Sequence, residues 1–198
     1  MKLLTEYHDL SYSKDAIKEA IVNKTPVTLR GIMQRAGVVN QNKRIYSKEI
    51  LMREVENYMK VIHENRALGE LDHPSESVVE LKNVSHVVKD LWWEGDDLHG
   101  VVEVLNTPNG MILQSLLESE IKIGISSRGV GSLKKDGENN IVEDDYVLIC
   151  FDVVSEPSTQ GAFIVREAKD ISLDILKTLK KEDRLNRILN NIITQQRL

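Results

Sequence analysis

The stretch that decides the fold is residues 84–105, VSHVVKDLWWEGDDLHGVVEVL. Two runs rich in valine, 84–93 and 98–105, flank the short acidic segment EGDD at 94–97, and the first run also contains both tryptophans of the chain. Branched and aromatic side chains favour extended backbone, whereas Gly and Asp favour tight turns. The stretch therefore predicts a β-hairpin, and with it a protein built on antiparallel strands.

Further strands are expected on both sides of this hairpin. Residues 27–33 and 121–125 have strand-like patterns, and 146–154 is an almost continuous apolar run, typical of a strand buried on both faces. Residues 37–46, GVVNQNKRIY, are interpreted as a basic, Asn-rich loop, and 134–145, KKDGENNIVEDD, as an exposed polar loop.

Two helices are expected between these strands. Ser47 has the side chain of an N-cap, and the apolar residues after it recur every three or four positions up to about Asn65. Thr107 and Pro108 have the residue types preferred at the cap and first position of a second helix. Strands with helices interposed predict the α+β class.

Length, charge and cysteine content exclude several kinds of protein. The chain has 198 residues and a net charge of −5, which disfavours non-specific binding to nucleic acid. Its one cysteine, Cys150, excludes an internal disulfide framework. No apolar run approaches the roughly 20 residues that span a bilayer, and the acidic, polar N-terminus is unlike a signal peptide. We expect no nucleic-acid partner, no membrane partner and a cytosolic setting.

The composition divides the chain into three parts. Residues 1–25 are polar and are expected to be a mobile N-terminal segment, and 26–168 should form the main domain. Residues 169–198 are predicted to be a charged, amphipathic helical tail. Two alternatives stay open for this tail: it packs on its own domain, or it docks elsewhere, either on another protein or over the functional site.

Three features could carry chemistry. His73 lies in GELDHP (69–74), where the proline prevents a continuing helix, and a histidine titrates near neutral pH, as proton transfer requires. GISSRGVG (124–131) sets two serines beside glycines, which could expose a hydroxyl and backbone N–H groups. Asp152 interrupts an apolar strand, and a buried carboxylate needs a partner, either a histidine N–H or a cation. Each feature has a purely structural alternative: a loop histidine, an ordinary turn, and a salt bridge.

The other histidines and the cysteine are weaker candidates. His73, His86 and His99 recur at intervals of 13 residues, but His86 and His99 lie on opposite arms of the hairpin, so their side chains are not expected to converge on a zinc ion. We expect no metal and no cofactor. His86 is an alternative third member of a catalytic triad, and Cys150, in mid-strand, is expected to be buried and unreactive.

Six motifs in order support a resemblance to a known family, although each is weak alone. In this order and spacing, over about residues 27–165, they resemble the prohead proteases of tailed bacteriophages, of the T-even type, which are distant relatives of the herpesvirus assemblins. The motifs are GVVNQNKRIY (37–46), GELDHP (69–74), KDLWWEGDDLHG (89–100), LNTPNG (105–110), GISSRGVGS (124–132) and FDVVSEPS (151–158).

This resemblance implies a mainly antiparallel β-barrel surrounded by helices, and a serine endopeptidase. The family histidine falls on His73, the serine on Ser126 and the acidic residue on Asp152, where the herpesvirus branch has a second histidine. Ser127 is the alternative nucleophile, because neighbouring side chains in a strand point to opposite faces.

An oxyanion hole is expected next to the serine. The resemblance implies backbone N–H groups between Ser127 and Gly129, aided by the side chain of Arg128, as donors to the tetrahedral intermediate.

The resemblance also implies substrates and a location. The family cleaves scaffold or core proteins and major capsid proteins inside the immature viral head, assembled in the host cytoplasm, after Glu in Leu/Ile-x-Glu contexts. Such contexts at 4–6 and 17–19 suggest self-cleavage in the segment expected to be mobile. A homodimer is a further candidate assembly. The rival interpretation is a catalytically inactive scaffold or internal head protein that has the protease fold.

A glutamate-selective pocket needs a fixed cation. The candidates in the sequence are Arg30, Arg35, Lys43 and Arg44.

Overall fold

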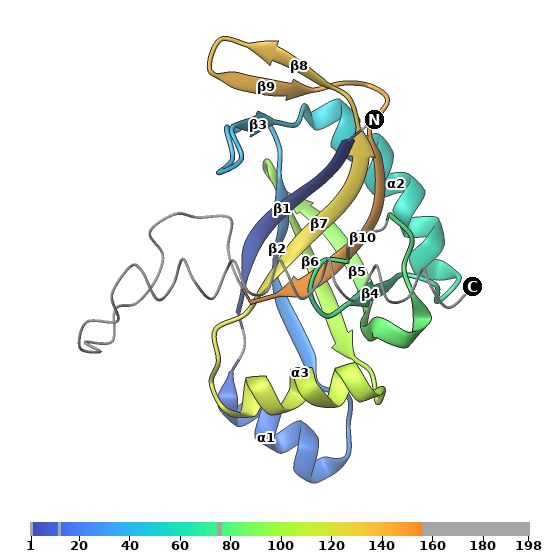
Figure 1. The fold of residues 1–198 in the computed structure, drawn as a ribbon. Helices are drawn as coiled ribbons and strands as arrows, with labels where there is room; N and C mark the ends of the chain where they lie inside the picture. Colours follow the sequence, from blue (N-terminus) through green and yellow to red (C-terminus); the bar gives the residue numbers. More distant parts are fainter. Residues whose placement is uncertain (1, 12, 75–76, 156–198) are drawn as a thin grey trace, which may run out of the picture. The chain divides into compact units, whose positions relative to one another are not determined.

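A computed structural model of the chain describes residues 2–11, 13–74 and 77–155 (Figure 1). These residues belong to one compact unit, Met1–Gln160. The helical tail expected at 169–198 lies outside the described residues.

The main element is a seven-stranded sheet in which every pair of neighbours is antiparallel. The expected α+β class with mostly antiparallel strands is therefore confirmed. In spatial order the strands are β10 (Val147–Val154), β7 (Gly124–Gly131), β1 (Lys2–Ser11), β2 (Thr28–Arg35), β6 (Asp97–Val104), β5 (Val84–Glu94) and β4 (Leu68–Glu70).

The sheet does not close into the expected barrel. Its edge strands β4 and β10 do not pair in a ladder. The chain just after β4 meets β10 at an isolated bridge between Leu71 and Val153, reinforced by the Asp72 N–H, which donates to the Val153 carbonyl at 2.8 Å. A strand of three residues is too short to form a ladder across the gap, which is why the expectation of a barrel was wrong. The near-closure brings the chain after β4 against β10, and this contact positions the site described below.

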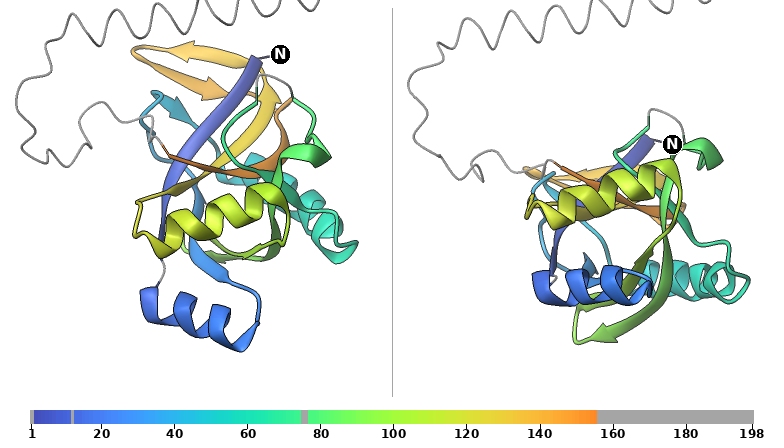
Figure 2. Two further views of the ribbon diagram at one scale, coloured as in Figure 1. Left: turned by 60° about the horizontal axis from the view of Figure 1, so that its bottom comes forward. Right: turned by 90° about the horizontal axis from the view of Figure 1, so that it is seen from below.

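The N-terminal segment is part of the sheet. Strand β1 lies between β7 and β2, and residues 2–9 pair with β7; in Figure 2 it is the dark blue arrow beside yellow β7. Leu4 is buried in the core, and Ser13 caps α1 (Lys14–Asn23). The expected boundary at residue 25 was wrong because the short apolar stretch of β1 is paired with β7 and includes the buried Leu4, which its polar neighbours obscured.

Two other expectations about loops were also wrong. Residues 124–131 form one continuous strand, β7, rather than a short strand that ends in a turn. The polar stretch at 134–145 contains a hairpin, β8 (Leu133–Asp136) and β9 (Asn139–Val142), which joins β3 (Arg44–Ile45) in a second, three-stranded sheet. Gly137 adopts a positive φ of 58° in its tight turn, so Asp136-Gly137 was a hairpin signal that the polar composition masked.

The expected helices and the deciding hairpin are confirmed. Ser47 caps α2 (Lys48–His63), and Thr107 caps α3 (Pro108–Glu118), which has proline at its first position. The hairpin consists of β5 and β6, and a single 3-10 turn, η1 (Leu81–Asn83), precedes it. Within the described residues no helix is long and apolar enough to span a membrane.

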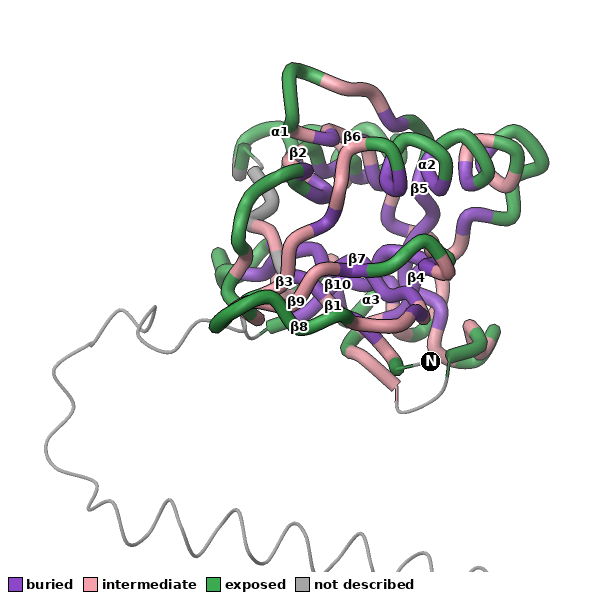
Figure 3. The backbone as a smooth tube through the Cα atoms, turned by 90° about the horizontal axis from the view of Figure 1, so that it is seen from above, coloured by how far each residue is buried: buried purple, intermediate pink, exposed green. Residues whose placement is uncertain are grey.

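The buried residues concentrate along β5, β7 and β10, as Figure 3 shows by colour. Phe151 and Val153 of β10 and Ile125 of β7 belong to the larger core cluster, against which Tyr58 of α2 packs its ring at 5.5 Å from that of Phe151. The middle of β7 is thus supported by strands on both sides and by a packed core.

Candidate active site

The two adjacent serines of β7 face opposite sides of the sheet. Ser126 pairs directly with Asp152 of β10, whereas Ser127 pairs with Phe151, a core residue. Residues directly opposite each other in an antiparallel pair project to the same face. Ser126 and Asp152 are therefore side by side, and Ser127 is directed away from both.

His73 completes this arrangement from the chain that follows β4. Asp72 adopts a positive φ of 64°, which Asp tolerates, and its N–H is fixed to β10 by the bond described above. The imidazole Nε2 lies 2.7 Å from Ser126 Oγ, and Nδ1 lies 2.9 Å from Asp152 Oδ2. Ser126 lies 53 positions after His73 in the sequence, and Asp152 lies 79 positions after it. The structure joins all three in one hydrogen-bonded chain.

Asp152 is completely buried and accepts hydrogen bonds on both oxygens. The Glu70 N–H donates to Oδ1 at 3.1 Å, and Arg128 Nε lies 2.8 Å from Oδ2. Hydrogen bonds and a nearby opposite charge both offset the cost of burying a carboxylate. Asp152 therefore satisfies the expectation that its burial needs partners, with a histidine and a cation together.

His86 does not take part in this chain. It is fully buried in β5; its ring contacts the Phe151 carbonyl through Nε2 at 2.9 Å and Ser85 Oγ through Nδ1 at 2.8 Å. Burial lowers the pKa of His86 to about 4, so the ring is neutral and donates from Nε2. The alternative triad assignment of His86 is contradicted, because both ring nitrogens are occupied by other groups.

Gly69 explains how tightly this region is packed. A Cβ at this position would lie 2.1 Å from the Phe151 carbonyl oxygen and 2.2 Å from His86 Nε2. Only glycine lets β4 approach β10 closely enough for the residues after it to reach Ser126.

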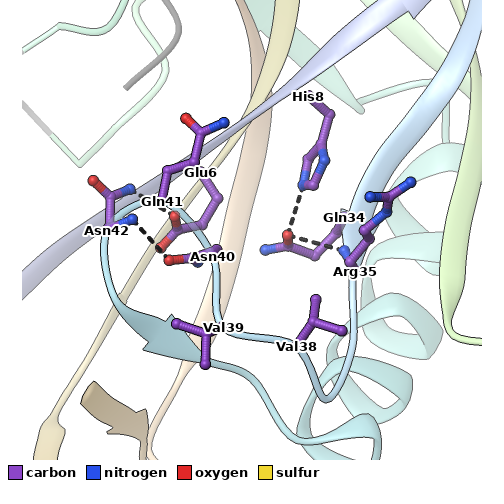
Figure 4. A pocket seen from close by; sticks show the side chains of 9 residues that line it. All are labelled: Glu6, His8, Gln34, Arg35, Val38, Val39, Asn40, Gln41 and Asn42. Carbon is purple, nitrogen blue, oxygen red and sulfur yellow. Dashed lines mark hydrogen bonds between the residues drawn. The ribbon is translucent and has the colours of Figure 1, made fainter. Parts of the chain in front are cut away.

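Ser127 belongs to a different network on the other face. Gln34 Nε2 donates to Ser127 Oγ at 3.0 Å, and Gln34 Oε1 lies 2.9 Å from His8 Nε2. Burial lowers the pKa of His8, which favours the neutral ring. Gln34 and His8 also border a cavity of about 180 Å³, drawn in Figure 4 and lined by Glu6, His8, Gln34, Arg35, Val38, Val39, Asn40, Gln41 and Asn42.

The expected oxyanion donors are contradicted. Strand β7 pairs with β1 on one side and β10 on the other around Ser127, Arg128 and Gly129, so their backbone N–H groups belong to the ladders. The Arg128 guanidinium is fully buried and forms ion pairs with Asp152 and Glu70 instead of standing ready for an oxyanion. Sequence reasoning gave Arg128 the wrong partner because it treated this segment as an open turn.

The four candidate cations for a glutamate pocket lie on the β2 and β3 side. Arg35 pairs with Asp97 at 3.0 Å, Lys43 with Glu138 at 3.9 Å, and Arg44 with the buried Glu6 at 3.0 Å. Arg30 is exposed on β2. Three of the four charges are thus already matched by carboxylates of this chain, and the structure does not single out one of them as a pocket cation.

Cys150 is buried, as expected, and burial raises the pKa of its thiol, so it stays protonated. It accepts from Arg128 Nε at 3.1 Å and donates to Asp152 Oδ1 at 3.4 Å. The described residues contain no cluster of three or more His, Cys, Asp or Glu able to hold a metal ion.

Sequence reasoning missed Glu70 and Gln34. Glu70 is completely buried beside Arg128, and Gln34 supports Ser127. A signal existed for Glu70, since it lies three residues before His73 in the motif GELDHP. Nothing in the sequence marked Gln34, whose partner is 93 residues away.

The serine, histidine and aspartate thus form one hydrogen-bonded row, and the comparisons with known proteins indicate a protease. The family model described as prohead core protein serine protease matches residues 12–172. The prohead core protein protease of Enterobacteria phage T4 is 35% identical over 147 residues, which cover 71% of this chain and 69% of that protein. The solved structure of the bacteriophage T4 capsid assembly protease, gp21, matches with a TM-score of 0.68 at 27% identity, over 79% of this chain and 98% of that chain.

The chain therefore belongs to the prohead core protein serine protease family, as its motifs had indicated. It is a protease of phage heads, and its fold is similar to that of the T4 capsid assembly protease.

Proposed function

We propose that the protein is a serine endopeptidase in which Ser126 is the nucleophile, His73 the general base and Asp152 the group that orients His73. The observation that carries this proposal is the pair of contacts made by one imidazole, 2.7 Å to Ser126 Oγ and 2.9 Å to Asp152 Oδ2. A serine hydroxyl is a weak nucleophile until an adjacent base accepts its proton.

The tautomer follows from the partners. The buried Asp152 carboxylate accepts, so His73 Nδ1 carries the proton and Nε2 is left to accept from the Ser126 hydroxyl. As Oγ attacks the scissile carbonyl, its proton moves to Nε2, and Asp152 stabilises the resulting imidazolium. The proton then passes from Nε2 to the leaving amine, and water hydrolyses the acyl-enzyme by the same route in reverse.

The direction of approach can be inferred from exposure. The His73 side chain is 26% exposed, whereas Ser126 is only 2% exposed. We infer that the substrate approaches over His73 and reaches the serine from that side.

Substrate class and location come to this chain from its family. We propose that it cleaves scaffold and capsid proteins inside the prohead, after Glu in Leu/Ile-x-Glu contexts, during head maturation in the host cytoplasm. The names of the T4 relatives, a prohead core protease and a capsid assembly protease, support the setting.

Self-cleavage is proposed at residues 17–19 rather than at 4–6. Leu4 and Glu6 are buried in β1, where they pair with β7, and a protease needs an extended, accessible substrate. Glu19 is exposed on α1, whereas Ile17 of the same helix is buried in the core, so cleavage there requires this helix of 10 residues to unfold first.

The test is a matched pair of serine variants, Ser126→Ala and Ser127→Ala, incubated with the cognate scaffold protein and read by gel and mass spectrometry. Ser126→Ala should lower cleavage by at least about 1,000-fold and abolish labelling by a fluorophosphonate probe, because it removes the nucleophile. Ser127→Ala should still cleave and label. Normal cleavage by Ser126→Ala would refute the assignment, and a wild-type chain that neither cleaves nor labels would favour the inactive head protein.

A further inference from the structure

Behind the proposed triad lies a buried group of three charges, which we call the charge cluster: Glu70, Arg128 and Asp152. All three side chains are completely buried. Arg128 contacts Asp152 through Nε at 2.8 Å and through Nη2 at 3.2 Å, and its Nη2 also forms a close ion pair with Glu70. Buried ions persist only when they are paired and hydrogen-bonded, so this cluster is a built feature of the fold.

Glu70 is tied to the site along two routes. Its backbone N–H donates to Asp152 Oδ1 at 3.1 Å, and its carboxylate reaches Asp152 through Arg128. Its other oxygen accepts from the Glu80 N–H at 2.9 Å, which fixes the carboxylate in place. Glu70 thus has a fixed position at the end of β4, three residues before His73.

The signs of these charges decide how strongly the charge cluster stabilises the protonated form of His73. Arg128 alone would neutralise Asp152 and leave little net charge to stabilise a protonated imidazole. With Glu70 present, the charge cluster sums to −1, which the imidazolium of the reaction brings to zero. Charges in a buried site are only weakly screened by solvent. Adding or removing one unit charge in the charge cluster therefore has a large effect on proton transfer to His73.

We propose that Arg128 and Glu70 are positioning residues for the peptidase reaction: Arg128 orients Asp152, and Glu70 offsets the positive charge of Arg128 so that Asp152 can still stabilise protonated His73. This inference rests on the proposed function. It assigns to both residues an action through Asp152 and His73, with no contact to the substrate.

The other titratable groups facing the cluster do not change charge in the working pH range. Burial raises the pKa values of Cys150, on β10, and of Tyr58, on α2, and it lowers that of His86, on β5, to about 4. Asp72 and Glu80, on the chain between β4 and η1, lie toward solvent. Of all these charged groups, Asp152 of the charge cluster is the one whose carboxylate contacts the His73 ring.

The experiment measures kcat/KM against pH for Glu70→Gln, with Glu70→Ala as a second variant that places no amide against Arg128. Each removes one negative charge from the charge cluster, which makes protonation of the imidazole less favourable, so the acidic limb of the profile should move to lower pH. The limb should move while KM stays within about threefold. Denaturation by urea verifies that each variant is folded.

The double variant Glu70→Gln/Arg128→Gln tests charge separately from packing. It restores a net charge of −1, so its acidic limb should return to within about 0.3 units of the wild type. Its kcat should nevertheless fall by about 100-fold, because Asp152 loses the donors that orient it. If Arg128 and Glu70 were merely structural, every variant would lose activity. The acidic limb would then neither move to lower pH in the single variants nor return in the double variant.

Glu80→Gln is the matched control, since it removes a surface carboxylate from the same stretch of chain, and its limb should stay within about 0.3 units. NMR titration of the His73 ring in each folded variant provides a readout that needs no turnover. A limb and a ring titration that coincide with the wild type in Glu70→Gln and Glu70→Ala would overturn the inference, while leaving the serine peptidase intact. Failure of the proposed function itself would be seen separately, as cleavage by Ser126→Ala.

Discussion

Ser126 and Ser127 are neighbours on β7 with the same side chain, yet they lie in opposite chemical environments. Ser126 Oγ contacts an imidazole whose other nitrogen meets a buried carboxylate. Ser127 Oγ accepts a hydrogen bond from the Gln34 amide, which in turn contacts His8. An amide cannot accept a proton from a serine, so only the face with His73 can activate a hydroxyl. The pleat of one strand decides which of two identical groups is reactive.

The largest expected effect comes from removing the charge behind His73. Asp152→Asn should lower kcat by about 10,000-fold, because an amide can hold the imidazole in the wrong tautomer and cannot stabilise its protonated form. Steady-state hydrolysis of a peptide with a Leu-x-Glu sequence measures it. Asp97→Asn, which removes a half-buried carboxylate paired with Arg35, is the control and should stay within about twofold. Equal losses in the two variants would mean that the Asp152 carboxylate is no more important for catalysis than a carboxylate outside the site. That result would contradict the contrast drawn between Ser126 and Ser127.

The comparison extends to two histidines, His73 in the site and His86 behind it. Because burial lowers the pKa of His86 to about 4, the folded chain resists protonation that the unfolded chain accepts near pH 6.5. Its contribution to stability is full above pH 6.5 and is lost progressively as the pH falls toward 4. Between pH 6.5 and about pH 5 this amounts to about 2 kcal/mol of unfolding free energy.

Urea denaturation at several pH values measures that loss by comparing the wild type with His86→Gln. The variant is expected to be less stable at neutral pH but to have a shallower dependence on pH over this interval. Parallel curves for the two proteins would show that His86 is not held neutral in the folded chain.

The smallest expected effect lies on the Ser127 face. Gln34→Leu removes the partner of the buried Ser127 hydroxyl and of the half-buried His8 ring, so it should lower the free energy of unfolding by about 1–2 kcal/mol, because these polar groups are left without a partner. Activity of the folded variant should stay within about threefold, since the network of Gln34 does not include His73. A loss of activity comparable to that of Asp152→Asn would mean that the reactive serine is Ser127 and not Ser126.

Local signals in the sequence were reliable where the partner was also local. The caps Ser47 and Thr107 bond to backbone groups three residues away, and the hairpin of β5 and β6 pairs segments separated by a short turn. Each of these structures depends on a few neighbouring residues, so its pattern could be recognised directly.

Expectations failed where the partner was distant. Strand β1 was interpreted as mobile because its partners, β7 and β2, are remote in the sequence, and β7 was interpreted as a turn because its glycines suggested one. The same error led to the oxyanion role for Arg128, since a paired strand leaves its N–H groups in the ladders. Propensity is a weak guide when tertiary pairing overrides it.

By itself, the sequence determined the α+β class, the two capped helices, the central hairpin and the family, through motifs such as GELDHP and GISSRGVG. Only the tertiary structure decided that His73, Ser126 and Asp152 meet, that Ser127 points away, and that Arg128 and Glu70 stand behind the carboxylate. The physical reason is register: whether a side chain faces the site or the opposite side depends on how β7 pairs with β10 and how closely β4 approaches them. A shift of one residue in that pairing would exchange the two serines.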